Sequence, residues 1–256
     1  MLKLEKHKAT QPPPPPSLFK LHSLSDTIST NCNMANEKIL SYNDVILLQS
    51  DLTILKNPCF LNDRIIEFYF THLSSLHSQQ ILFLPPSITF WITNCPDTDS
   101  LSDFLQPLNL PSKQLIFFPV NNNDDVAVAE GGTHWSLLVF FQTKNLFVHH
   151  DSFHGINNHH AKRLYKRVVS YATCDLDDTE TRYMEYVRTP QQVNGFDCGL
   201  YVLAIAKEIC RWFDGDGNKN EDDLWFLFVK ERVTSISVSG MRREILELIR
   251  SLREKK

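Results

Sequence analysis

Hydrophobic residues recur with a helical period in several parts of the chain. In residues 60–76 one helix face carries Ile65, Ile66, Tyr69 and Leu73. Asn62 stands where a side chain is expected to cap the start of this helix. The same period predicts helices over 157–172 and 198–213 and two more helical stretches after residue 223.

Short apolar runs rich in aromatic residues predict strands between these helices. These strands are expected over 114–121, 133–141 and 145–150. A polar loop, 121–132, joins the first two, and residues 184–190 are expected to be extended. Mixed strands with helices toward both ends predict an α+β domain.

The first 36 residues differ in composition from the rest of the chain. They contain the polyproline run "QPPPPP" (11–16) and a segment rich in Ser, Thr and Asn. Such a sequence buries too little apolar surface to offset the entropy of ordering it. We therefore predict a disordered Pro/Ser-rich tail over 1–36 and one folded domain over 37–256.

The turn between the last two predicted strands brings two ionisable residues together. A two-residue loop at Thr143 and Lys144 sets the pairing register. Ser136 then lies opposite Asp151, and His134 lies one diagonal step away on the same face of the sheet. Diagonal neighbours are roughly 7–8 Å apart at the backbone, within reach of an imidazole and a carboxylate. The sequence therefore predicts that His134 lies beside Asp151, unless the register shifts by one residue.

Cys198 is predicted to begin the helix over 198–213. The unpaired N–H groups and the dipole at a helix start favour a thiolate. An imidazole beside it and an acid that orients the imidazole would complete a Cys–His–Asp triad. The Gln192 side-chain amide and the Cys198 N–H could both donate to an oxyanion. Taken singly, each of these residues also fits an ordinary structural role, such as a buried thiol or a turn-capping acid.

Composition and charge narrow the class of protein. The 256 residues are 42% hydrophobic and 22% charged, which is ordinary for a globular protein. A net charge of −4 favours neither nucleic acid nor an anionic membrane as a partner, and no apolar run approaches the roughly 20 residues of a membrane span. The six scattered cysteines form no C-x-x-C pair, and the N-terminus lacks the apolar core of a secretory signal. We therefore expect free thiols in the cytoplasm, the nucleus or both.

A cluster of histidines and other polar residues raises the question of a metal site. The segment "HHDSFHGINNHH" (149–160) holds six potential ligands, but its spacing matches no zinc motif. The acidic segment 214–223 lacks the acid spacing of a calcium loop. We expect no metal site, and most of these histidines at the surface.

Three segments together resemble a known family. "GGTHWSLLVF" (131–140), "HHDSF" (149–153) and "QQVNGFDCGLYV" (191–202) look like the His, Asp and Gln/Cys boxes of the sentrin-specific, ubiquitin-like-protein proteases. These belong to the cysteine peptidase clan that also contains the adenovirus protease. The resemblance covers about residues 39–255 and implies a papain-like fold with a central mixed sheet flanked by helices.

The same resemblance implies a role for each boxed residue. His134 would be the general base and Asp151 the acid that orients it. Cys198 would be the nucleophile, and the Gln192 amide would donate to the oxyanion. Trp135 would lie over the narrow channel that admits the Gly-Gly tail of the modifier. No cofactor is implied.

Two further segments resemble the deneddylase branch of the family. They are "LSYNDVILLQSDLTILKNPCFLNDRIIEFYF" (40–70) and "PLNLPSKQLIFFPVNNNDD" (107–125). That branch cleaves after the Gly-Gly of a NEDD/RUB-type modifier, and the likeness implies substrate-binding roles for Asn62, Asp63 and Gly195. Phe60 stands where the branch usually has Trp.

The resemblance implies a monomeric enzyme that acts on the modifier precursor, on its conjugates (cullins among the candidates), or on both. A SUMO-specific protease is the alternative within the family. A non-catalytic modifier-binding module and an acetyltransferase that uses the same Cys–His pair are the alternatives from other classes.

Overall fold

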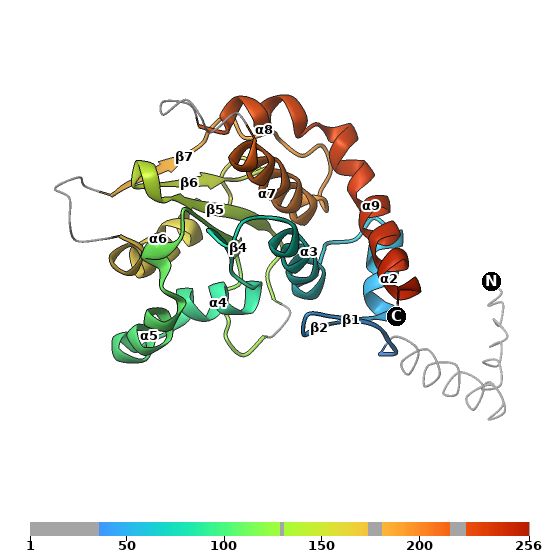
Figure 1. Ribbon diagram of the computed structural model, residues 1–256, viewed down its shortest axis with the longest axis horizontal. Coiled ribbons are helices and arrows are strands. Elements are labelled where there is room, and N and C mark those ends of the chain that lie inside the picture. Colours follow the sequence, from blue (N-terminus) through green and yellow to red (C-terminus); the bar gives the residue numbers. More distant parts are fainter. Residues whose placement is uncertain (1–35, 129–130, 174–180, 216–223, 256) are drawn as a thin grey trace, which may run out of the picture.

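The computed structural model describes residues 36–128, 131–173, 181–215 and 224–255. At its centre lies a five-stranded mixed sheet (Figure 1). In spatial order the strands are β3 (Ile81–Phe83), β4 (Leu115–Asn121), β5 (Trp135–Phe141), β6 (Leu146–His150) and β7 (Arg182–Glu185). β5 is antiparallel to both of its neighbours, β4 and β6, whereas the edge strands β3 and β7 run parallel to theirs. The expected α+β class with a central mixed sheet is therefore confirmed.

Helices cover both faces of this sheet (Figure 1). On one face, α3 (Asp63–Leu76) and α7 (Cys198–Asp214) pack against the sheet. The helices α2 (Gln49–Lys56), α8 (Phe226–Arg232) and α9 (Ser235–Glu254) complete the same apolar core. The other face packs against α4 (Pro86–Asn94), α5 (Thr98–Leu105) and α6 (Asn158–Ala172). A separate antiparallel hairpin of β1 (Lys38–Tyr42) and β2 (Val45–Leu48) lies beside the first layer, and short 3-10 turns span Gln106–Leu108, Leu110–Ser112 and Gln142–Lys144.

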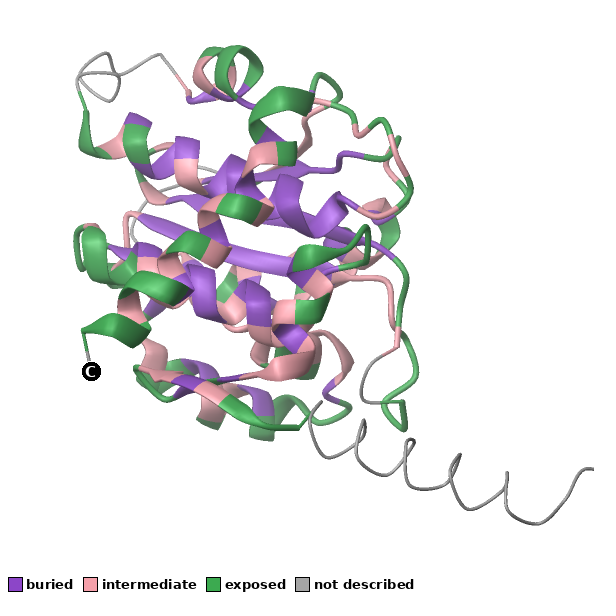
Figure 2. Ribbon diagram, turned by 90° about the vertical axis from the view of Figure 1, so that its right-hand side faces the viewer, coloured by how far each residue is buried: buried purple, intermediate pink, exposed green. Residues whose placement is uncertain are grey.

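Burial of the sheet on both faces explains its continuous apolar runs. Side chains of β4 alternate, so that Leu115 and Phe117 enter one core and Ile116 and Phe118 enter the other. Every residue of β5 is buried. Figure 2 shows this burial across the sheet and along the inner sides of the helices. A strand covered on both sides is mostly apolar on both of its faces, which is why a simple alternation of apolar and polar residues is absent here.

The predicted helices are present, with shifted ends. α3 begins at Asp63, and Asn62 caps it as expected, its Oδ1 accepting the Ile65 N–H (3.1 Å). The predicted helices over 157–172 and 198–213 are α6 and α7. The extended run predicted over 184–190 is the strand β7, which begins and ends earlier. The elements β1, β2, α2, β3, α4 and α5 were not among those predicted.

The register predicted for the hairpin is confirmed. Leu137 pairs with His150 and Phe141 with Leu146, which is the pairing that a two-residue loop would have set. The turn itself is longer than predicted: it takes in Gln142–Lys144 and Asn145, whose φ of 45° lies in the left-handed region. Asparagine is one of the few residues that adopt this conformation readily.

Some predictions fall on parts of the chain that the structure does not describe. Residues 1–35 of the predicted tail lie outside the described residues, as does most of the acidic segment 214–223.

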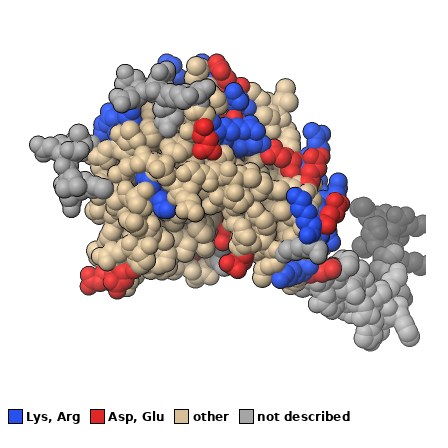
Figure 3. All heavy atoms as spheres, viewed as in Figure 1, with Lys and Arg blue, Asp and Glu red and all other residues tan. Residues whose placement is uncertain are grey.

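Within the described ranges, no helix has both the length and the apolar character needed to cross a membrane. On the face in Figure 3, basic and acidic side chains are interspersed, mainly toward α8 and α9.

Candidate active site

His134 and Asp151 meet at one end of the β5–β6 hairpin. His134 directly precedes β5 and Asp151 directly follows β6. The His134 Nε2–H donates to Asp151 Oδ1 at 2.7 Å. Their side chains are almost removed from solvent, with residue exposures of 4% and 6%. The hairpin therefore brings together the two residues that strand alternation predicted to be neighbours.

Backbone N–H groups also hold the carboxylate of Asp151. Asp151 Oδ1 accepts the Phe153 N–H and Oδ2 accepts the Asn157 N–H, both at 2.8 Å. Burial alone raises the pKa of Asp151, but the hydrogen bonds from His134 and these N–H groups outweigh it and hold the pKa below its ordinary value. Asp151 is therefore an anion that fixes the orientation of the imidazole.

Cys198 faces the same imidazole from another element. It is the first residue of α7, is fully buried, and acts on the pKa of His134. Because His134 Nε2 is hydrogen-bonded to Asp151, Nδ1 is the ring nitrogen left for the sulfur. Burial lowers the pKa of His134, but Asp151 and Cys198 both raise it, and their effect prevails and brings the pKa to about 9. The imidazole between the two residues is therefore cationic at neutral pH.

Gln192 lies beside this group with its side-chain amide held at both ends. Its Nε2–H donates to the Asn194 carbonyl (2.7 Å), and its Oε1 accepts from Ser152 Oγ (2.9 Å). Its backbone N–H donates to the Ser152 carbonyl (2.8 Å). The amide thus has a fixed orientation, and one of its two N–H groups is bonded to Asn194.

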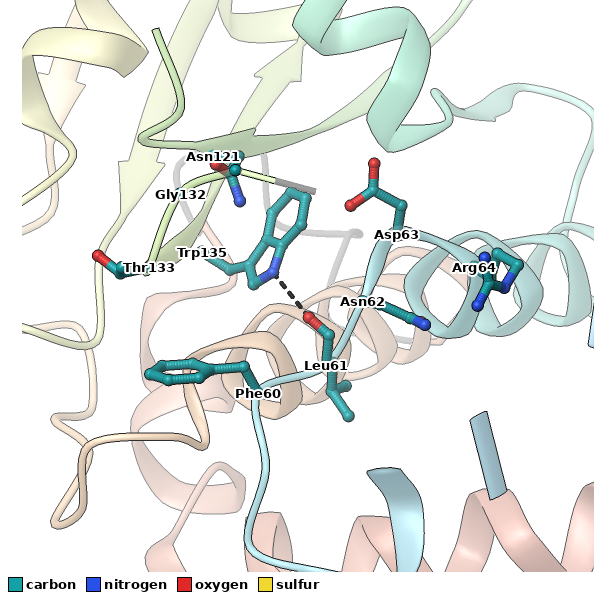
Figure 4. Close-up of a pocket in the computed structure, with 10 residues that line it drawn as sticks. Phe60, Leu61, Asn62, Asp63, Arg64, Asn121, Gly132, Thr133 and Trp135 are labelled. Carbon is teal, nitrogen blue, oxygen red and sulfur yellow. Dashed lines mark hydrogen bonds between the residues drawn. The ribbon is translucent and has the colours of Figure 1, made fainter. Parts of the chain in front are cut away.

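A cavity of about 410 Å³ is lined in part by Thr133 and Trp135, the two chain neighbours of His134 (Figure 4). One wall comes from the segment that enters α3 and the other from the end of β4 and the start of β5; the lining residues are Phe60, Leu61, Asn62, Asp63, Arg64, Asn121, Gly131, Gly132, Thr133 and Trp135. The Trp135 indole N–H donates to the Leu61 carbonyl (3.0 Å), so the indole ties the two walls together.

The family resemblance implied a substrate-binding role for four residues, and only three of them line the cavity. Trp135, Asn62 and Asp63 line the cavity. Gly195 does not: it lies exposed in the turn before Cys198, and a Cβ built on it meets no atom within 4 Å.

Leu61 connects the cavity wall to the helix that carries the cysteine. A Cβ built on Gly199 would lie 2.9 Å from Cβ of Leu61, closer than real side chains approach. Only glycine at this position lets α7 come so near the wall. Cys198 does not line the cavity, but its neighbour Gly199 packs directly behind it.

Asn157 is a fully buried residue at this site that the sequence did not single out. Its Nδ2 donates to the Val120 carbonyl (3.1 Å), to the His134 carbonyl (3.3 Å) and to Ser136 Oγ (3.0 Å). Its backbone N–H binds Asp151. The side chain of Asn157 thus holds the ends of β4 and β5 together, and its backbone N–H adds the end of β6. The only available signal was an Asn in a polar run before a helix, which is too common to distinguish.

The expectation that most histidines of segment 149–160 lie at the surface is confirmed for His154 and His159, which are exposed, and wrong for His149 and His150. His149 and His150 are each 1% exposed, because both faces of β6 are covered. His149 is hydrogen-bonded to Ser136 Oγ (2.8 Å) and Glu185 Oε2 (2.5 Å). Burial, with a smaller effect of His149, lowers the pKa of His150 to about 3, and its Nε2 accepts the Trp225 indole N–H (2.9 Å).

The described residues include no group of three His, Cys, Asp or Glu side chains that could hold a metal ion. The four described cysteines, Cys59, Cys95, Cys198 and Cys210, are free thiols, and Cys32 and Cys174 lie outside the described ranges. Burial raises the pKa of the Cys210 thiol well above its ordinary value.

Comparisons with known proteins agree with this geometry. Residues 59–224 match the model of the Ulp1 protease family, C-terminal catalytic domain. NEDD8-specific protease 1 of Arabidopsis thaliana is 53% identical over 218 residues, which cover 85% of this chain and 94% of that protein. Sentrin-specific protease 8 of Homo sapiens is 37% identical over 68% of this chain and 82% of its own length.

Solved structures show the same fold. The C-terminal Ulp1 protease domain in complex with Smt3, the yeast orthologue of SUMO, has a TM-score of 0.58 at 20% identity and covers 89% of this chain and 95% of that one. The SUMO protease Ulp1 with its catalytic cysteine oxidised to a sulfenic acid has a TM-score of 0.60 at 17% identity, with coverages of 94% and 97%.

Proposed function

We propose, from the premise that this chain belongs to the Ulp1 protease family, that it cleaves after the C-terminal glycine of a NEDD8-type ubiquitin-like modifier. The chain is a cysteine peptidase of that family. The high identity to the Arabidopsis relative supports the choice of modifier. The observation that carries the proposed chemistry is the His134 imidazole, which is hydrogen-bonded to Asp151 and whose pKa is raised by both Asp151 and Cys198.

The proposed reaction begins at the sulfur of Cys198. The thiolate attacks the carbonyl carbon of the modifier's last glycine, and the His134 imidazolium gives its proton to the departing amine. This leaves a thioester and a neutral imidazole. The imidazole then takes a proton from water, the hydroxide displaces the sulfur, and the modifier leaves with a free carboxylate. Asp151 keeps the Nε2–H in place throughout, so that Nδ1 carries the moving proton.

The oxyanion that forms on attack needs donors close to Cys198. We assign this role to the Cys198 N–H and the Gln192 amide. The N–H of a residue that begins a helix has no acceptor within the helix. The second N–H of the Gln192 amide would be the donor, while the first keeps the amide oriented through Asn194.

We assign the modifier's tail to the cavity between Asp63 and Trp135. Leu61 of one wall lies against Gly199, next to Cys198, and Thr133 and Trp135 of the other wall are the neighbours of His134. An extended tail laid along the cavity would therefore lead toward the sulfur. The departing group would be either a short C-terminal extension or the lysine of a conjugated protein, with cullins as candidates. The reaction as proposed uses no cofactor. We further propose that the enzyme acts as a monomer in the cytoplasm, the nucleus or both.

A comparison of modifier substrates tests this proposal. The same preparation is assayed with the C-terminal aminocoumarin amides of NEDD8, SUMO and ubiquitin. We expect the NEDD8 amide to have the highest kcat/KM; faster cleavage of the SUMO amide would overturn the choice of modifier.

Two cysteine variants test the nucleophile in the same assay. Cys198→Ala should abolish turnover, whereas Cys59→Ala, which removes an exposed thiol, should keep the wild-type rate. Wild-type turnover in Cys198→Ala would exclude the proposed mechanism. A binding module without activity would instead show no turnover of any amide by the wild-type chain.

A further inference from the structure

One side chain of the C-terminal helix reaches the turn that carries Cys198. Arg242 of α9 donates from Nη2 to Oδ1 of Asp197 at 2.9 Å, and Asp197 directly precedes Cys198. Asp197 is 5% exposed, and the Arg242 side chain is 14% exposed. Removing one partner of such a pair would leave a charge largely shielded from water.

The same guanidinium group also holds the chain that leads into the cavity wall. Arg242 Nη1 donates to the Ile54 carbonyl (3.0 Å) and Nη2 to the Cys59 carbonyl (2.6 Å). Cys59 lies two residues before Leu61, whose carbonyl accepts the Trp135 indole N–H. A planar guanidinium can serve three acceptors at fixed angles, which a lysine ammonium cannot reproduce.

From Asp197 the contacts continue to the proposed oxyanion donor. Asp197 Oδ2 accepts from Asn194 Nδ2 (2.7 Å), and Asn194 Oδ1 accepts the N–H groups of Phe196 (3.1 Å) and Asp197 (3.0 Å). The Asn194 carbonyl in turn accepts from the Gln192 amide (2.7 Å). An unbroken series of hydrogen bonds therefore joins Arg242 to Gln192.

We propose that Arg242 is a positioning residue for the hydrolysis. It holds the turn 192–198 and the wall segment 59–61 in one arrangement, so that the thiol and oxyanion donors face the end of the tail cavity. This inference rests on the proposed role of Cys198. It assigns a part in the site to α9, which lies beyond residue 224, where the match to the family model ends.

A neighbouring residue offers a matched control. Glu244, also on α9, accepts from the Tyr69 hydroxyl (2.8 Å) and from Lys207 Nζ (2.7 Å), and so joins α9 to α3 and α7. None of these contacts touches the turn 192–198. Glu244→Gln therefore weakens the packing of α9 without loosening that turn.

The first experiment compares kinetics with stability in Arg242→Ala, Arg242→Lys and Glu244→Gln. With the NEDD8 amide, we expect Arg242→Ala to lower kcat at least about tenfold while KM changes less than about threefold, because misplaced groups reduce the rate of the chemical step. Arg242→Lys should fold, keep the ion pair with Asp197 and recover only part of kcat. Glu244→Gln should lose free energy of unfolding and keep kcat within about twofold. A folded Arg242 variant with wild-type kcat, or an equal loss in Glu244→Gln, would overturn the proposal.

A second measurement does not depend on the modifier. Chloroacetamide alkylates exposed or activated thiols, and mass spectrometry of the Cys198 peptide gives its rate of alkylation. We expect Arg242→Lys to change the Cys198 rate more than about threefold from the wild-type rate, and Glu244→Gln to leave it unchanged. A wild-type Cys198 rate in Arg242→Lys would count against the inference. This result holds even if no modifier amide is cleaved, so a failure of the proposed function remains distinguishable.

Discussion

Burial and hydrogen bonding act in opposite directions on His134. Burial removes water from the imidazolium and lowers its pKa, whereas Asp151 and Cys198 stabilise the cation and raise the pKa to about 9. The second effect prevails because the carboxylate is itself held as an anion by backbone N–H groups. The residue thus carries, at neutral pH, the proton that a departing amine requires.

The raised pKa of His134 predicts that the stability of the fold depends on pH. The pKa of His134 rises from an ordinary 6.5 to about 9 on folding, so its charged form stabilises the fold fully below pH 6.5. The contribution, at most about 3 kcal/mol, is lost as the pH rises from there through about 9. Urea unfolding of wild type and His134→Gln should therefore show a larger difference at about pH 6 than at about pH 9.5. The same difference at both values would contradict the ionised pair.

The site residues differ in how far their interaction partners lie from them in the sequence. His134 and Asp151 are 17 residues apart in one hairpin, so strand alternation was enough to pair them. Cys198 was found because a helix start is visible in the sequence. Arg242 is 45 residues from Asp197, and its other acceptors are backbone carbonyls. Any residue type presents a carbonyl, so no sequence pattern marks such a contact.

At the level of elements, the close approach of α7 to the cavity wall depends on a missing side chain. Gly199→Ala would place a methyl group 2.9 Å from Cβ of Leu61, so either the helix or the wall must move. Overpacking of this kind destabilises by about 1–3 kcal/mol. We expect kcat/KM for the NEDD8 amide to fall at least about tenfold, because Leu61 also fixes Trp135.

A second glycine provides the control for this substitution. Gly240 lies inside α9, where an added Cβ meets nothing within 4 Å. Gly240→Ala should therefore raise the free energy of unfolding by about 0.5–1 kcal/mol and leave kinetics unchanged. If Gly199→Ala matched this behaviour in thermal unfolding and turnover, the close contact with Leu61 would not limit either stability or activity.

The elements that the sequence predicted are those with long or strongly apolar patterns. α7 and β5 bury almost all of their residues, so their patterns are unmistakable. β3 has three residues and α5 has eight, and such short elements owe their stability to tertiary packing rather than to local sequence. The buried His149 and His150 were misjudged for a related reason: polar residues in a strand suggest exposure unless their partners are known.

At the level of the whole molecule, the class of the fold was predictable and the order of its strands was not. Successive strands β4, β5 and β6 are neighbours, as apolar runs that follow one another in the sequence suggest. β3 and β7 join the edges as parallel strands through longer connections, and nothing in their own residues specifies this. The disordered tail predicted over 1–36 stays a prediction.

This strand order has a consequence for how the molecule folds. The antiparallel meander β4–β5–β6 closes the segments 122–134 and 142–145, whereas Ile81 must find Leu115 and Leu146 must find Arg182 across longer segments. Loop-closure entropy grows with the length closed, so the meander is expected to form first. His134 and Asp151 would then be paired while Cys198 is still undocked.

Pulsed hydrogen exchange during refolding measures this order directly. Amides of β5 and β6 should be protected before those of β7, and turnover should return only in the later phase. Simultaneous protection of all five strands would contradict this order of folding. A refolding chain with this sequence of events passes through a state that holds the proton-transfer pair but no nucleophile, and so cannot act on a substrate until its core is closed.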